Sequence, residues 1–179
     1  MSRKTLVTIH LYLAAFFAPI LLIMAVSGGL YLLDIKGSME KGETIVLEGV
    51  TIDDTGDKSA QVKKLLEQAN LSNDFEYLKD RGAVMQTRPT SRDHYEIKTT
   101  GNRVEITPVS PDLVAAMMEL HKGHGPGLFR LLEQIMALGL ILTLLTGLIV
   151  GLQSPLLKTR TVGFTAAGIF VFVIFAAIM

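Results

Sequence analysis

The sequence contains no cysteine, which excludes disulfides, thiolate metal sites and thiol nucleophiles. It also lacks a phosphate-binding glycine loop, a dinucleotide-binding glycine unit and a serine nucleophile elbow. Acidic residues are missing from most of the chain, because sixteen of the seventeen lie between Asp34 and Glu119. No complete catalytic constellation remains, and we expect a protein that is not an enzyme.

Three long apolar runs fill most of the segments that lack acidic residues. They cover residues 6–33, 128–152 and 162–179, and each is close to or above the roughly 20 residues that cross a bilayer as a helix. Arg130 and Glu133 lie in the entry turn of the second run. Being three positions apart, they are expected to pair near the membrane interface. The sequence predicts three transmembrane helices.

The short basic segments predict how these helices are oriented. Residues 1–5 and the loop 153–161 each carry two basic residues and no acidic one, so both are expected in the cytoplasm. Residues 34–124 and the C-terminus are then extracytoplasmic. The 34–124 segment carries sixteen acidic and twelve basic residues, a balance of −4 that argues against a nucleic-acid partner.

The 34–124 segment has the pattern of a small α+β domain. An amphipathic helix is predicted over 57–71, where apolar residues recur at helical spacing. Alternation and turn residues predict strands at 44–50, 75–79, 84–88, 95–98 and 103–107. Ser110, Pro111 and Asp112 predict a second helix, with the serine as its N-cap, running to about Lys122. A glycine-rich stretch then separates this helix from the second span.

Several short motifs in a fixed order resemble the PepSY-associated transmembrane family. They are His10, the Ser-Gly-Gly-Leu-Tyr-Leu of 27–32, the Leu-His-Lys-Gly of 120–123, Gly127, Arg130 and the Leu-Thr-Gly-Leu of 145–148. The resemblance covers roughly 6–152. It implies a bacterial inner-membrane protein with a small PepSY-like domain on the periplasmic face. Larger relatives carry a fourth span and include haem-bearing reductases linked to iron-siderophore uptake, but this chain lacks their second half.

Histidine is the residue type that could carry redox chemistry here. His10 and His121 are candidate ligands of a b-type haem, as the resemblance implies for larger relatives. The predicted topology puts them at opposite membrane faces, about 30 Å apart, so a single haem would need a ligand from a second chain. The alternative is that both are interfacial residues. His94 is expected on a solvated strand edge or loop.

A metal site is a separate interpretation of the histidines that precede the second span. His121 and His124 are three residues apart, and Glu119 with Met117 or Met118 lies close by in sequence. One turn of a helix can present two imidazoles on one side. The alternative is that the two histidines belong to a polar turn.

Small residues within the apolar runs predict close helix packing. Gly28, Gly29, Gly147 and Gly151 are the expected contact positions. The first hypothesis is therefore an accessory or assembly subunit in the bilayer, with other membrane subunits or a second copy as partners. The alternative is a b-type haem electron-transfer protein whose ligands are shared with a second chain.

Overall fold

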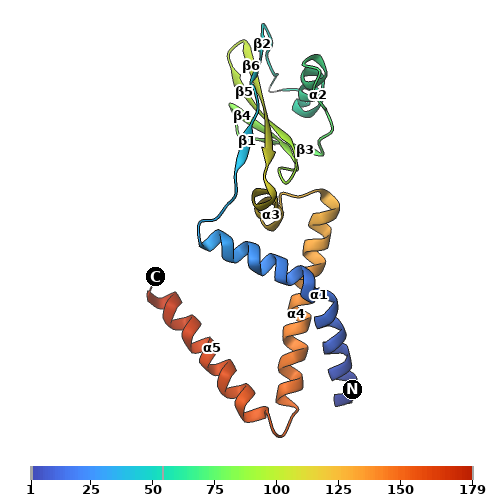
Figure 1. Ribbon diagram of the computed structural model, residues 1–179, viewed down its shortest axis with the longest axis vertical. Coiled ribbons are helices and arrows are strands. Elements are labelled where there is room, and N and C mark those ends of the chain that lie inside the picture. Colours follow the sequence, from blue (N-terminus) through green and yellow to red (C-terminus); the bar gives the residue numbers. More distant parts are fainter. Residues whose placement is uncertain (1, 54, 179) are drawn as a thin grey trace. The chain divides into compact units, whose positions relative to one another are not determined.

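The computed structural model describes residues 2–53 and 55–178. They form two compact units, one containing the chain up to Leu22 and from Gln134 onward, the other running from Ile23 to Glu133. Figure 1 shows the long helices and the sheet domain. We define the sheet domain as residues 39–121, which hold all the strands.

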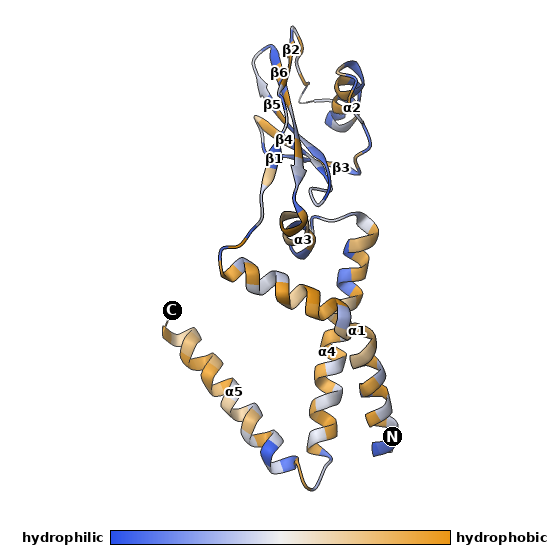
Figure 2. Cartoon of the chain, viewed as in Figure 1, coloured by the Kyte–Doolittle hydropathy of each residue, from blue (hydrophilic) through white to orange (hydrophobic). Residues whose placement is uncertain are grey.

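The three apolar runs form helices α1 (Arg3–Leu32), α4 (Gly127–Leu152) and α5 (Lys158–Ile178). All three are long and apolar enough to cross a membrane, and Figure 2 shows apolar residues along each of them. α5 begins at Lys158, four residues before the predicted start. The reason is that Ser154 O accepts the N–H groups of Leu157 and Lys158, which starts the helical turn directly after α4.

The sheet is antiparallel, with the strand order β1-β6-β5-β4-β3 and with β2 also paired to β6. Its strands are β1 (Met39–Lys41), β2 (Ile45–Glu48), β3 (Tyr77–Asp80), β4 (Val84–Arg88), β5 (His94–Thr100) and β6 (Arg103–Pro111). The predicted strands are confirmed within a few residues at their ends. β1 was not predicted, because three exposed residues carry no alternating pattern.

Helix α2 (Lys58–Gln68) covers one face of the sheet. Asp57 caps it by accepting the N–H groups of Ser59 and Ala60, as expected of an aspartate at this position. Its apolar stripe packs on the inward side chains of the strands to form the core of Val62, Leu65, Leu66, Phe75, Met85, Ile97, Val104 and Ile106. The opposite face of the sheet is left free of α2 and carries polar side chains such as Gln86 and Glu96, which hydrogen-bond to each other; we call it the polar face.

Helix α3 (Leu113–His121) begins two residues later than predicted. With Ser110 as the N-cap, Pro111 would have been the first helical residue. Ser110 and Pro111 extend β6 and pair with β1, so the N-cap is Asp112 and the prediction of Ser110 was wrong. One carboxylate oxygen of Asp112 accepts the Ala115 N–H at 2.7 Å, and the other accepts both the N–H and the hydroxyl of Ser38. Asp112 therefore ties α3 to the segment that follows α1.

Gly37 makes this close approach possible. Its φ of +71° lies in the left-handed region that favours glycine. A Cβ atom added there would also lie 2.3 Å from the backbone nitrogen of Ala115. No larger residue fits where this segment passes the first turn of α3.

Candidate functional site

His121, the last residue of α3, is held by a hydroxyl from the end of α1. Its Nδ1 lies 3.0 Å from Ser27 Oγ, and the Ser27 hydroxyl donates its proton to Met24 O at 2.9 Å. Because that proton is already used, we assign the shared hydrogen to His121 Nδ1. In the neutral ring this tautomer leaves the lone pair on Nε2.

This imidazole lines a cavity of about 500 Å³ between the end of α1 and α3. Apolar side chains form much of the wall, and the lining residues are Gly28, Tyr31, Leu32, Met118, His121 and Lys122. A Cβ atom on Gly28 would lie 3.4 Å from His121 Cε1, so the bare glycine backbone lets the ring pack closely. A mostly apolar cavity with one oriented polar group has the character of a ligand site.

His10 is held in the same way in the other unit. Its Nδ1 lies 3.0 Å from Thr146 Oγ1, and that hydroxyl already donates to the carbonyls of Leu142 and Thr143. A Cβ atom on Gly147 would lie 2.9 Å from His10 Cε1. Each candidate haem ligand thus has a hydroxyl beside Nδ1 and a glycine against its ring.

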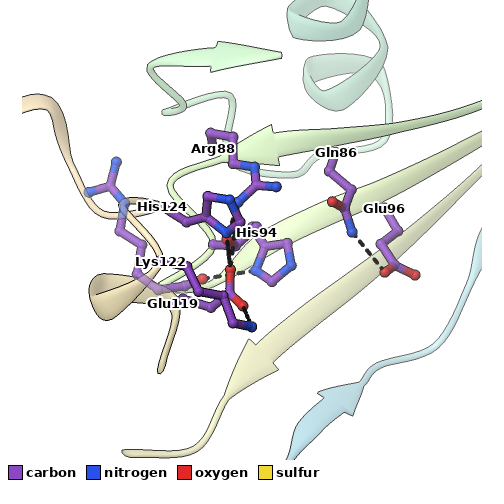
Figure 3. A network of polar contacts seen from close by, with 9 residues as sticks. Gln86, Arg88, His94, Glu96, Glu119, Lys122 and His124 are labelled. Carbon is purple, nitrogen blue, oxygen red and sulfur yellow. Dashed lines mark hydrogen bonds and ion pairs between the residues drawn. The ribbon is translucent and has the colours of Figure 1, made fainter. Parts of the chain in front are cut away.

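Glu119 is the centre of a buried polar cluster at the end of α3 (Figure 3). Its Oε2 atom accepts the Thr90 hydroxyl at 2.5 Å and the His124 Nδ1–H at 2.7 Å, while Oε1 accepts Lys122 Nζ at 2.8 Å. Arg88 Nη1 lies 3.6 Å from Oε2 and donates to Thr90 Oγ1 at 2.6 Å. One carboxylate thus joins α3, the end of β4 and the glycine-rich turn.

This environment keeps Glu119 ionised. Burial favours the neutral acid and raises its pKa, but the hydrogen bonds from Lys122, Thr90 and His124 outweigh burial and lower the pKa to about 2. The Glu119 side chain is only 10% exposed, so this stabilisation is weakly screened by solvent.

The structure gives the two histidines of the predicted metal site different partners. His121 is bonded to Ser27, whereas His124 is bonded to Glu119. Within residues 2–53 and 55–178, no three histidine, aspartate or glutamate side chains gather in a way that could hold a metal. The His121–His124 metal site stays a prediction, with Glu119 already engaged by three donors.

The start of α4 is bonded to the sheet domain through Glu76 and Tyr77, which the sequence did not single out. Glu76 accepts the Gly127 N–H at 2.8 Å, which places a carboxylate at the helix N-terminus. The Arg130 guanidinium lies over the Tyr77 ring, 5.1 Å from its centroid. In the described chain no ion pair joins Arg130 to Glu133. A hydrogen bond to the Glu76 carboxylate and a cation–π contact on Tyr77 thus hold the start of α4 against the beginning of β3.

The four predicted packing glycines have different surroundings. Gly28 and Gly147 lie against histidine rings, as described above. A Cβ atom on Gly151 would lie 2.6 Å from Thr161 Oγ1, so it permits the tight turn between α4 and α5. A Cβ atom on Gly29 would meet nothing within 4 Å.

Comparison with known families identifies this architecture. The family model described as "Putative PepSY_TM-like" matches residues 50–179, well over half of the chain. The chain belongs to this family. The matched range of the PepSY_TM-like family begins before α2 and includes α5. The motifs noted in the sequence extend over 6–152. His10 and the 27–32 motif therefore lie outside the matched range. No curated protein and no solved structure matches the chain.

Proposed function

We propose that this PepSY_TM-like protein is a non-enzymatic accessory or assembly subunit of a complex in the bacterial inner membrane. In this proposal the sheet domain is periplasmic and the helices contact a further membrane subunit or a second copy of the chain. The family assignment and the three apolar helices support the membrane setting. The partner contact is argued from α5.

The observation that carries the proposal is a pair of small residues on α5 that are both exposed. Gly163 and Ala167 are four residues apart and so lie on one face of the helix. This spacing is a frequent contact motif between membrane helices, because small side chains let two backbones approach. A Cβ atom on Gly163 would meet nothing within 4 Å, and no residue of α5 is buried.

Site-directed photocrosslinking tests this contact, and the chain suits it because it has no native cysteine. A maleimide photoprobe is attached to Ala167→Cys, or to Ile169→Cys as the control on the opposite helix face. In native membranes we expect a discrete crosslinked protein from position 167 and much less from position 169. Crosslinks to lipid alone from both positions, with no protein copurifying in mild detergent, would contradict the proposal.

A second candidate function is electron transfer by a b-type haem, favoured by the state of His121. Haem iron takes a neutral imidazole nitrogen, and ligating histidines commonly donate their other ring N–H to a fixed acceptor. His121 meets the second condition through Ser27, and in its neutral form its Nε2 atom would meet the first. Its cavity has apolar walls, so the residues present fit one axial ligand. When bound, haem would supply one-electron transfer, and a second chain would supply the other ligand.

An absorption spectrum of the protein purified from haem-replete cells tests this candidate. We expect a Soret band that is lost in His121→Ala and kept in His94→Gln, a control whose imidazole does not line the His121 cavity. Ser27→Ala should retain the band but shift it, because the imidazole loses its acceptor. A colourless wild-type preparation would reject haem and leave the accessory role standing.

A further inference from the structure

We propose that the PepSY_TM-like chain binds a small oxyanion, a carboxylate or a phosphate, in a second cavity on the polar face of its sheet. The cavity has a volume of about 240 Å³ and is separate from the one that His121 lines. Arg88 from β4, His94 from β5 and Lys122 from the end of α3 contribute to its wall. Figure 3 shows these residues, with Gln86 and Glu96 farther along the same strands.

The carboxylates of this cavity are already satisfied. Glu96 accepts Lys41 Nζ at 2.6 Å and Gln86 Nε2 at 3.1 Å. Glu119 accepts three donors, as described above. Both groups therefore already have donors, and the cationic Arg88 and Lys122 beside them would repel a further cation.

The hydrogen-bond donors in the wall, unlike its carboxylates, are not all paired. Arg88 is 3% exposed, and its Nε atom is buried without a hydrogen-bond partner among the described residues. A buried donor without an acceptor is costly and rare in folded proteins. Arg81, also in the wall, forms no ion pair in the described chain. The guanidinium fork matches the oxygens of carboxylate and phosphate.

Two imidazoles also line the cavity, and the prediction of a solvated position for His94 was wrong, because His94 is only 4% exposed. His94 donates its Nδ1–H to Arg92 O at 3.0 Å, and His124 donates its Nδ1–H to Glu119. Both rings are thus fixed through Nδ1. The Nε2 atom of each ring becomes a further donor when the ring is protonated.

Charge and size define the class of ligand. Three wall cations, Arg81, Arg88 and Lys122, face two carboxylates, Glu96 and Glu119, so the cavity has an excess of one positive charge with the histidines neutral. Its volume corresponds to about eight waters at about 30 Å³ each. This is room for a phosphate or a short dicarboxylate, and it is smaller than a typical pocket for drug-sized ligands.

Titration calorimetry on the full chain in detergent tests the proposal, with succinate and inorganic phosphate as separate probes against sodium chloride of equal ionic strength. We expect saturable binding of at least one probe. Succinate alone identifies a carboxylate site, phosphate alone a phosphate site, and both a general oxyanion site. Heat from neither probe beyond the chloride control would overturn the proposal.

Variants locate the binding. Arg88→Lys removes the fork while keeping the charge, and it should weaken binding about tenfold, the effect of losing one charge-assisted hydrogen bond. Arg81→Gln, at a residue outside the buried cluster, should weaken oxyanion binding severalfold. This variant tests the proposal if Arg88→Lys does not fold. Lys98→Gln, on the same sheet but not in the wall, should have no effect. Equal affinity in all three variants would also overturn the proposal.

Discussion

Glu119→Gln is expected to lower the local stability of α3 by about 3 kcal/mol at neutral pH. The pKa of Glu119 is lowered from 4.5 to about 2 in the folded chain, and lowering a pKa by one corresponds to about 1.4 kcal/mol. Glutamine keeps the shape of the side chain but removes the charge that Lys122 and Arg88 face. Removing one partner of a buried charged cluster leaves the others uncompensated.

The pH dependence follows from the direction in which the Glu119 pKa moves on folding. A carboxylate whose pKa is lower in the folded state stabilises the fold fully above its unfolded value and loses that contribution as the pH falls. For Glu119 the loss should occur between about pH 4.5 and about pH 2. The wild type should therefore lose the local stability of α3 across this window, and Glu119→Gln should lose much less.

Hydrogen exchange of the α3 and β4 amides in the full chain measures this local stability directly. Glu48→Gln is the matched control, since Glu48 also pairs with an arginine, Arg103, but its side chain is 70% exposed. Exposed pairs contribute about 1 kcal/mol or less. If the two variants increased exchange equally, the buried cluster would not have the role assigned to it.

The sequence predicted the parts of the fold that depend on local pattern. The long apolar runs near the N-terminus and over 128–152 became α1 and α4, and the 84–88 alternation became β4 without change. The β1 strand was missed because its order comes from pairing with β6, more than sixty residues away. Because of the same pairing, Ser110 is part of β6 and the N-cap of α3 is Asp112.

The candidate sites were predicted only in part, for a related reason. His10 and His121 stand out in a sequence with four histidines. The ring of His121, however, is held by a hydrogen bond with Ser27, which is 94 positions away. In the sequence Ser27 looks like one more small residue in an apolar run. In the sequence Arg88 and Thr90 resemble the end of a strand and its turn, and nothing local indicates that they meet Glu119.

The accessory-subunit proposal expects the sheet domain and the loop between α4 and α5 to lie on opposite sides of the membrane. The absence of native cysteine allows this to be tested by single-cysteine labelling. Asn102→Cys lies in the turn between β5 and β6 and is exposed. Leu156→Cys lies between α4 and α5, where the native side chain is 84% exposed. Both positions are accessible to a reagent that reaches their side of the bilayer.

The decisive measurement is the labelling of these two variants by a membrane-impermeant maleimide, first in intact spheroplasts and then after lysis. We expect Asn102→Cys to react fully in intact spheroplasts and Leu156→Cys to react only after lysis. The basic residues in the first turns of α1 and α5 are the physical reason to expect this orientation. Labelling of Leu156→Cys in intact spheroplasts, with Asn102→Cys protected until lysis, would contradict the account.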